Sequence, residues 1–412
     1  MEKSRKPKIR FKGFTDDWEQ RKLGELVQFS KGNGYSKRDL EEVGTPIILY
    51  GRLYTNYETV ISDVDTYVCA KSGSVYSRGG EVIVPASGET SEDISIASVV
   101  EKPGFLLGGD LNIITPSIQL DSVFLAISIS NGKPHNVMAK MAQGKSVVHL
   151  HNSDLEKIDL LFPEHDEQAR ISSCIRGIDY LITLHQRKLE KLMNVKKSML
   201  EKMFPKRGSD VPEIRFFGFT DAWEQRELGN VGQTYTGLSG KTKDDFGHGH
   251  AQFVTYMNVF SNPISNPKMN EPIEVDSKQN EVEVGDVFFT TSSETPKEVG
   301  MTSVLIEKQG KMYLNSFCFG YRLYEKYDSY YLAYMLRSNS FREKIIMLAQ
   351  GISRYNISKN KVMEIDVFIP SYKEQMEIGK YFRDLDTLIT LHQRKLEKLK
   401  NIKKSMLEKM FI

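Results

Sequence analysis

The sequence has little cysteine and no long apolar run, and these absences exclude several classes of protein. Its cysteines, Cys69, Cys174 and Cys318, are odd in number and too far apart for a Cys-x-x-Cys pair. We therefore expect neither a disulfide framework nor a zinc cage, and a cytoplasmic location fits best. No stretch of about 18 apolar residues occurs, and no apolar core follows the basic N-terminus, so the sequence predicts neither secretion nor a membrane span.

The chain also lacks an excess of charge of either sign. Its 56 Lys and Arg residues against 54 Asp and Glu residues give a formal net charge of +2. Binding to nucleic acid would therefore depend on local clusters, because the whole chain supplies no steering field. The length of 412 residues allows two to four domains at about 100–200 residues each.

Two blocks of sequence occur twice. Residues 7–26 match 212–231 at 14 of 20 positions, and both copies contain Gly-Phe-Thr-Asp-x-Trp-Glu-Gln-Arg. Residues 181–204 match 388–411 at 22 of 24 positions. The chain is a tandem duplication with a pseudo-twofold internal repeat. The two tryptophans, Trp18 and Trp223, lie in the first block, and we expect them to anchor a core.

A weaker correspondence persists between the blocks, which predicts one fold with two different surfaces. Its members share an offset of 205 or 207 residues and are Ser87-Gly88-Glu89-Thr90 with Ser292-Ser293-Glu294-Thr295, Gln143-Gly144 with Gln350-Gly351, and Pro163 with Pro370. β-Branched and aromatic runs predict strands at 81–84, 96–100, 286–290 and 301–306. Periodicity predicts helices in the segments 122–142 and 329–349 and long helices over about 165–204 and 372–411.

The long helices carry an apolar seam with steps of four and three residues. From Ile171 and Ile378 onward the seam includes Ile178, Ile182, His185, Leu189, Leu192, Leu385, Ile389, His392, Leu396 and Leu399. This spacing predicts a coiled coil in which each helix packs antiparallel against the other copy, with the histidines fixing register. Off the seam, Leu181, Leu184, Leu200 and Phe204 widen the apolar stripe and leave surface for another subunit.

The order of these motifs, doubled at constant offset, resembles the DNA-specificity (S) subunit of type I restriction-modification systems. The resemblance spans essentially the whole chain and includes Pro163 with Glu167-Gln168 and Pro370 with Glu374-Gln375. It implies an α+β fold in which two mixed α/β target-recognition domains are joined by two long helices that form an antiparallel coiled coil. The expected divisions are a first domain at 1–164, a central helix at 165–205, a second domain at 206–371 and a C-terminal helix at 372–412.

The family's function would then be sequence-specific recognition of double-stranded DNA, with one domain reading each half of a bipartite, asymmetric target. The helices would dock two methyltransferase (modification) subunits, and restriction/translocase subunits would join them. The chain itself would be non-catalytic, and S-adenosylmethionine, ATP and Mg would be bound by the partner subunits. The alternative is a two-headed protein-interaction scaffold that does not bind DNA.

Candidate DNA contacts are loop residues of types that read base edges or hold phosphates. They are Tyr35, Lys37, Arg38, Arg52, Tyr54, Ser87, Thr90, Gln143, Lys145 and Ser146 in the first half, and Thr236, Ser239, Lys241, Lys243, Ser292, Ser293, Thr295, Lys297, Gln350, Ser353, Arg354, Tyr355 and Asn356 in the second. Each has an ordinary alternative as a solvated charge or as a cap of a helix or turn.

Motifs for catalysis and metal binding are incomplete. Gly240-Lys241-Thr242 ends like a phosphate loop, but Tyr235 stands where the motif requires its first glycine. Asp276-Ser277-Lys278 could imitate the end of a nuclease triad, but a lone Asp-x-Lys is common by chance and is usually a solvated charge cluster. The histidine pairs at 149/151 and 248/250 have no nearby ligand set at metal spacing, so we expect no metal site.

Overall fold

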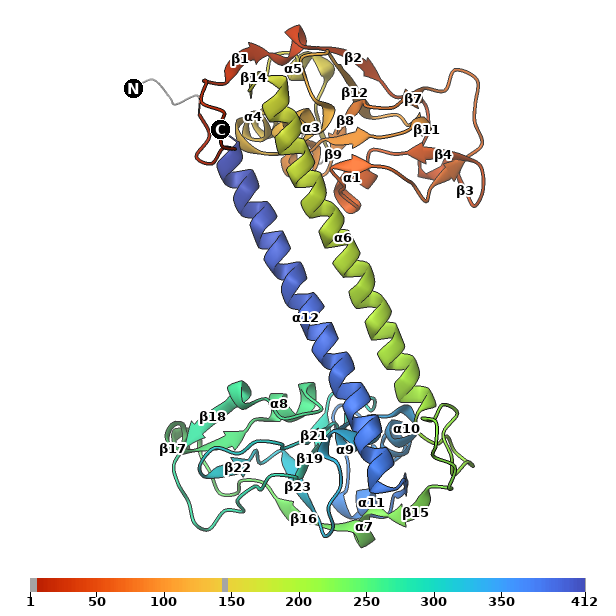
Figure 1. Ribbon diagram of the computed structural model, residues 1–412, viewed down its shortest axis with the longest axis vertical. Coiled ribbons are helices and arrows are strands. Elements are labelled where there is room, and N and C mark those ends of the chain that lie inside the picture. The colour runs from red at the N-terminus through yellow and green to blue at the C-terminus, as the bar shows by residue number, and fades with distance from the viewer. Residues whose placement is uncertain (1–5, 143–146, 412) are drawn as a thin grey trace. The chain divides into compact units, whose positions relative to one another are not determined.

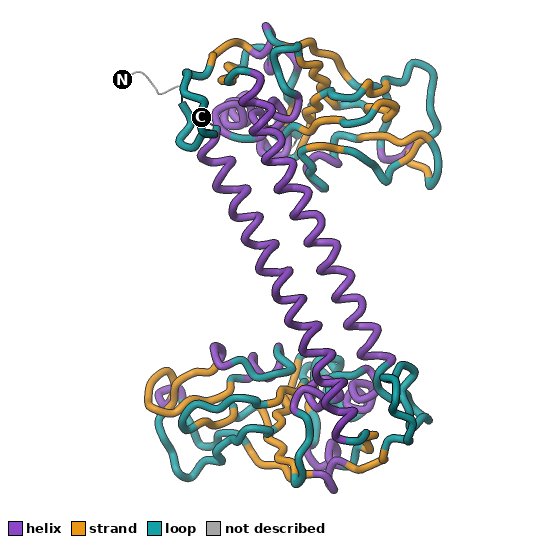
Figure 2. The backbone as a smooth tube through the Cα atoms, viewed as in Figure 1, coloured by secondary structure: helices purple, strands orange, loops and turns teal. Residues whose placement is uncertain are grey.

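The computed structural model describes residues 6–142 and 147–411. The chain divides into two units, which we call unit 1 (the described residues of 1–186 and 394–412) and unit 2 (187–393). Each unit mixes helices and strands (Figures 1 and 2), which confirms the expected combination of α and β structure. The candidate residues Gln143, Lys145 and Ser146 lie outside the described residues.

Unit 1 contains two five-stranded sheets. Their strands are β2 (Val27–Lys31), β3 (Leu40–Glu41), β4 (Thr45–Ile48), β5 (Val60–Ile61), β6 (Tyr67–Val68), β7 (Tyr76–Arg78), β8 (Val82–Pro85), β10 (Ser98–Val100), β11 (Pro103–Leu107) and β12 (Leu111–Pro116). The orders are β2-β12-β8-β10-β5 and β3-β6-β4-β11-β7. Strand β8 is central and wholly buried because its apolar side chains are covered on both faces of the sheet.

Unit 2 repeats this arrangement with fewer strands. They are β16 (Gly232–Thr236), β17 (Phe246–Val254), β18 (Asn270–Ile273), β19 (Val287–Thr290), β21 (Thr302–Val304), β22 (Met312–Leu314) and β23 (Cys318–Leu323), in the orders β16-β23-β19-β21 and β18-β17-β22. The parallel pairing of Leu107 with Ile48 in unit 1 recurs as Leu314 with Val254 in unit 2. The two variable regions therefore share their strand pairing, as their common skeleton predicted.

The segments 122–142 and 329–349 are helical, as predicted, but each is divided into two helices. The first segment forms α3 (Ser122–Ser130) and α4 (Gly132–Met141), and the second forms α9 (Ser329–Met335) and α10 (Asn339–Met347). Asn131 is extended at φ −141° and ψ 164°, and Gly132 follows at φ 67°, so the chain leaves the helical region between α3 and α4. Ser338 is extended in the same way before α10, with ψ at 154°.

The repeated N-terminal block adds a short strand to each unit. Strand β1 (Glu19–Lys22) pairs antiparallel with β14 (Asp159–Phe162), and β15 (Glu224–Glu227) pairs with β25 (Asp366–Ile369). Trp18 and Trp223, just before these strands, are 1% and 3% exposed. They are core anchors, as expected. The short helices are α1 (Arg52–Thr55), α2 (Ser91–Ile94), α5 (Asn152–Leu155), α7 (Leu228–Val231), α8 (Tyr256–Ser261) and α11 (Lys359–Met363).

The long helices α6 (His165–Lys202) and α12 (Tyr372–Met410) contribute to both cores. In unit 1, Ile171 and Ile175 from the start of α6 share a core with Met410 and Phe411 at the end of α12. In unit 2, the start of α12 and the end of α6 are arranged in the same way. Phe204 is buried in that second core, which corrects the expectation that it widens an outward-facing stripe.

Within each unit the two helices run antiparallel. In unit 1, Asp179 of α6 forms an ion pair with Lys403 of α12 at 2.6 Å. In unit 2, Lys196 of α6 forms an ion pair with Asp386 of α12 at 2.6 Å. The ten seam residues named above are all buried or half-buried. A coiled coil along the whole length of the helices stays a prediction.

Candidate nucleic-acid interface

The structure joins two motifs that lie about 60 residues apart in each half. In unit 1, β9 (Ser87–Gly88) pairs antiparallel with β13 (Val148–His149), and Ser87 stands opposite His149. In unit 2, β20 (Ser292–Ser293) pairs with β24 (Tyr355–Asn356), and Ser292 stands opposite Asn356. We call these two-stranded elements the ribbons. They have the same register but carry different side chains.

The first ribbon uses its polar groups largely for its own structure. Ser87 is 5% exposed, and its Oγ lies 3.0 Å from Nδ1 of His149. Thr90 caps α2, accepting from the backbone N–H of Asp93 at 3.2 Å while the Asp93 carboxylate accepts from the backbone N–H of Thr90 at 2.9 Å. Thr90 is therefore a helix cap, which is the ordinary alternative for this candidate, and Ser87 is buried beside His149, whose side chain is exposed.

The second ribbon ends in a tight turn that presents several candidates together. Backbone N–H groups of Gln350 and Asn356 donate to each other's carbonyl oxygens at 3.0 and 2.8 Å. Gly351 has φ 141°, and a Cβ there would lie 2.0 Å from the carbonyl oxygen of Arg354, so only glycine fits. Ser353 and Arg354 are exposed at the turn. The candidates Gln350 to Asn356 thus form one compact surface.

Several other candidates are committed to internal contacts. Tyr35 is 8% exposed, and its hydroxyl accepts from the backbone N–H of Lys71 at 2.6 Å. Arg52 pairs with Glu58 at 2.7 Å and with Asp65 at 3.1 Å. These partners neutralise the guanidinium group and reduce its value as a phosphate ligand. Lys37 and Arg38 remain exposed, and Tyr54 is half-buried.

The candidates in the first loop of unit 2 also include a structural ion pair. Lys241 contacts Asp276 at 2.9 Å, and hydrogen bonding to Lys241 lowers the pKa of Asp276 to about 2. The Asp276-x-Lys278 segment therefore has a structural explanation. Exposed residues in this region and on the following loop are Thr236, Ser239, Lys243, Thr295 and Lys297, while Ser292 is half-buried and Ser293 is buried.

Sequence reasoning missed the apolar part of this surface. A hollow of about 460 Å³ borders the second ribbon and is lined by Tyr256, Met257, Phe260, Ser292, Ser293, Glu294, Glu298, Phe317 and Arg354. Three of these nine were candidates. The aromatic residues at 256 and 260 are four apart on α8, and this spacing was the available clue because it places two rings on one face of a helix.

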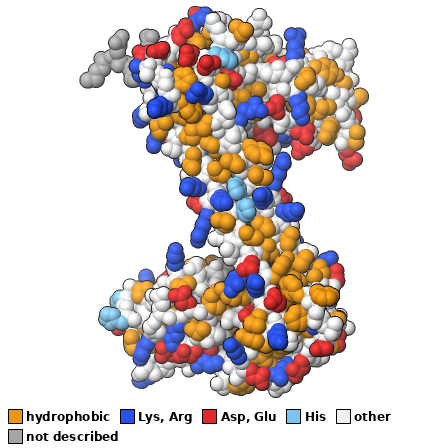
Figure 3. All heavy atoms as spheres, in the orientation of Figure 1, with side chains coloured by type: hydrophobic (Ala, Val, Ile, Leu, Met, Phe, Trp, Pro, Cys, Tyr) orange, Lys and Arg blue, Asp and Glu red, His pale blue; other side chains and the backbone are white. Residues whose placement is uncertain are grey.

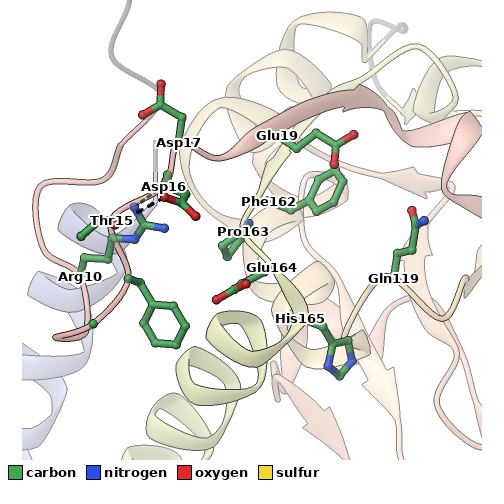
Figure 4. A pocket seen from close by; sticks show the side chains of 12 residues that line it. Arg10, Thr15, Asp16, Asp17, Glu19, Gln119, Phe162, Pro163, Glu164 and His165 are labelled. Atoms are coloured by element: carbon green, nitrogen blue, oxygen red, sulfur yellow. Dashed lines mark hydrogen bonds between the residues drawn. The ribbon is translucent and has the colours of Figure 1, made fainter.

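A second hollow, of about 380 Å³, lies in unit 1 beside the repeated block (Figure 4). Its acidic lining consists of Asp16, Asp17, Glu19 and Glu164, and the only Lys or Arg lining it is Arg10. Arg10 donates to the carbonyl oxygen of Asp16 at 2.5 Å. The carboxylates make this hollow unsuitable for DNA phosphates, so it is not part of the candidate interface.

Among residues 6–142 and 147–411, no group of three or more His, Cys, Asp or Glu side chains is placed to hold a metal ion. A search of the same residues finds no helix of the length and apolarity that crossing a membrane requires. Figure 3 shows hydrophobic side chains on the surface over the long helices. Leu181 in unit 1 and Leu388 and Leu391 in unit 2 are 41%, 45% and 44% exposed.

The fold is similar to solved structures of restriction-modification subunits. The S subunit of a type I restriction-modification system from M. genitalium matches with a TM-score of 0.61, 14% identity and 99% coverage of both chains. A structure described as showing complex assembly and conformational transition of the type I R-M system matches with a TM-score of 0.52, 16% identity and coverage of 96% of this chain and 97% of that one. At these identities the likeness concerns the fold alone.

Sequence comparison defines the family. The family model described as the type I restriction modification DNA specificity domain matches residues 15–194 and 220–401, so the chain belongs to this family, and the resemblance seen in the sequence is confirmed. The putative type I restriction enzyme MjaX specificity subunit of Methanocaldococcus jannaschii is 24% identical over 95% of this chain and 92% of its own length. The type I restriction enzyme MjaVIII specificity subunit of the same organism is 20% identical over 95% and 91%.

Proposed function

We propose that each unit of this DNA-specificity subunit reads one half of a bipartite, asymmetric DNA sequence. The observation that carries this proposal is the pair of ribbons. Ser87 faces His149 in one, and Ser292 faces Asn356 in the other, so one scaffold presents two different sets of side chains. Two related surfaces of this kind suit two different half-sites, whereas identical surfaces would suit a palindrome.

The exposed candidates divide by chemistry into two kinds of contact. Arginine and asparagine side chains such as Arg354 and Asn356 are suited to guanine and adenine edges in the major groove. Lysines such as Lys37, Lys243 and Lys297 are suited to phosphates, which position the protein without carrying sequence information. We propose that the same unit combines both, with the ribbon reading bases and the lysine loops holding the backbone.

The long helices are proposed to act as a spacer and a docking surface. A continuous antiparallel coiled coil would fix the separation of the half-sites, and the exposed Leu181, Leu388 and Leu391 would contact two methyltransferase subunits. Restriction/translocase subunits would join this assembly. The chain would be non-catalytic in the cytoplasm, and its partners would bind S-adenosylmethionine, ATP and Mg. Family membership favours this function over a two-headed scaffold without DNA.

The test is to map N6-methyladenine across host DNA with the gene present and with it deleted. The proposal predicts that methylation at one bipartite, asymmetric motif disappears on deletion and returns when the gene is restored. A control gene carrying an early stop codon should fail to restore it. Methylation that is unchanged by deletion, in a host expressing the modification subunits, would contradict the proposal.

A further inference from the structure

Each unit carries a pair of aromatic rings at the same place in its fold. In unit 1, Tyr50 and Tyr54 have ring centroids 6.2 Å apart, and in unit 2, Tyr256 and Phe260 are stacked at 6.0 Å. These pairs are equivalent in the fold. Ile48 of β4 and Val254 of β17 hold matching positions in the parallel strand pairs, and in each unit the two rings lie two and six residues after that position. An aromatic pair is therefore a shared feature of the two units.

Unit 2 adds two exposed apolar side chains to its pair. Met257 and Phe317 line the hollow of about 460 Å³ and are 53% and 58% exposed. By the same strand registers, Met257 corresponds to Gly51 of unit 1 and Phe317 corresponds to Asp110. Neither Gly51 nor Asp110 offers an apolar side chain. The apolar hollow thus distinguishes the two units at a corresponding place.

The backbone around this hollow is fixed by hydrogen bonds. The hydroxyl of Tyr256 donates to the carbonyl oxygen of Ser292 at 2.6 Å, which ties α8 to the second ribbon. The N–H and the hydroxyl of Thr291 both donate to the carbonyl oxygen of Phe317, at 3.0 and 2.9 Å. These hydrogen bonds fix the chain that carries Met257 and Phe317 next to the ribbon, and none of them involves the side chain of Met257 or Phe317, so replacing these two side chains leaves them intact.

The polar residues of the hollow show which part of DNA it suits. Arg354 is accompanied by Glu294 and Glu298, and carboxylates repel phosphates. In the major groove, by contrast, Glu accepts from the amino group of cytosine, Arg donates to guanine, and apolar side chains contact the methyl group of thymine. A lining that mixes both charges with exposed apolar groups matches base edges and not the sugar-phosphate backbone.

We propose that this hollow recognises the 5-methyl group of a thymine in the half-site read by unit 2, and that Met257 and Phe317 contact it. The inference rests on the proposed function, and it adds the base and the chemical group that unit 2 selects. At the two equivalent positions of unit 1, Gly51 and Asp110 offer no apolar side chain for such a contact.

The test uses the full chain bound to its modification subunits and a duplex that carries the motif found by methylation mapping. Each thymine in the unit 2 half-site is replaced singly by uracil, which removes only the methyl group. Burial of one methyl group predicts that binding weakens by about three- to tenfold at one position. Met257→Ala combined with Phe317→Ala should bind the thymine and uracil duplexes with the same affinity.

Tyr324→Ala is the matched control, because Tyr324 is a 62% exposed aromatic residue of unit 2 that does not line the hollow. This variant should discriminate as the wild type does. Trp223 fluorescence of the free chain, measured in a Trp18→Phe background, should show that unit 2 is folded in all variants. The inference is overturned if uracil has no effect at any position, if the half-site has no thymine, or if the double variant still discriminates. A wild-type complex that does not bind the motif would overturn the proposed function itself.

Discussion

The guanidinium group of Arg10 holds both carboxylate oxygens of Glu167, with Nε and Nη2 each 2.7 Å from an oxygen. Arg215 and Glu374 repeat this contact in unit 2 at 2.7 and 2.8 Å. Glu167 is completely buried and Glu374 is 1% exposed. The repeated N-terminal block and the Pro-x-x-x-Glu-Gln segment are therefore bonded to each other in both units, and the hydrogen bond to Glu167 raises the pKa of Arg10.

Removing Arg10 should destabilise unit 1. Arg10→Ala leaves a buried carboxylate without its cation, and breaking such a pair costs about 3–5 kcal/mol. Chemical denaturation followed by Trp18 fluorescence, in a Trp223→Phe chain, measures this loss. The control is Lys22→Ala in the same unit, which removes an ion pair with Asp159 between side chains that are each 50% exposed and should cost about 0–1 kcal/mol. Equal losses for the two variants would contradict the structural role of the Arg10 pair.

The end of α12 should stabilise unit 1. Phe411 is 9% exposed, and its ring centroid lies 5.7 Å from that of Phe124 and 6.3 Å from that of Trp18. Phe411→Ala should cost about 3–5 kcal/mol through the cavity it leaves. The transition reported by Trp18 should shift to lower denaturant concentration.

The two tryptophans provide the control, because each unit contains one of them. Phe204→Ala should instead shift the transition reported by Trp223 in a Trp18→Phe chain, since these rings lie 6.4 Å apart. If Phe411→Ala left the Trp18 transition unchanged, or moved only that of Trp223, the assignment of the helix end to unit 1 would be wrong.

The seam of α6 should be needed for assembly. Leu189 and Leu192 are half-buried, and in the predicted coiled coil replacing both with Asp would place two charges against the facing helix and disrupt the packing. Sedimentation of the chain co-expressed with modification subunits should then show loss of the complex. Gln186→Asp with Asn194→Asp is the control, because it adds the same two negative charges at exposed, uncharged positions of the same helix. A complex that sediments unchanged with the leucine variant would refute this prediction.

Arg354 and Lys243 should differ in what they contribute to DNA binding. Arg354→Ala should weaken binding of the target by about 1–3 kcal/mol and relax the preference at one base pair. Lys243→Ala should weaken all sequences alike and reduce the salt dependence by about one unit of slope. Anisotropy titrations against duplexes altered one base pair at a time, at several salt concentrations, separate these effects. A uniform loss for Arg354→Ala would identify it as a phosphate contact.

The sequence was most informative where two copies could be compared. The offsets of 205 and 207 residues predicted one repeated fold, and the paired strands Leu107 with Ile48 and Leu314 with Val254 agree with it. The same comparison linked Pro163 to Glu167-Gln168, but it gave no reason for the link. In the structure the Gln168 side chain donates to the carbonyl oxygen of Pro163 at 2.8 Å and accepts from the backbone N–H of Asp121 at 2.9 Å.

Other features depend on contacts between distant residues, which a single sequence does not reveal. The pairing of Ser87 with His149 joins segments 62 residues apart, and the burial of Phe204 depends on a core supplied by another part of the chain. Arg52 and Lys241 were selected as basic loop residues, yet both have acidic partners that are remote in sequence. Residue type and loop position do not distinguish a free cation from a paired one.

The most direct test of the account is to exchange residues 27–160 for those of a related specificity subunit with a different target and to map methylation again. Because this segment holds the variable part of unit 1, only one half of the bipartite motif should change, to the half read by the donor. The other half and the motif's asymmetry should stay. A change in both halves, or an unchanged motif produced by a folded chimera, would contradict the assignment of one half-site to each unit.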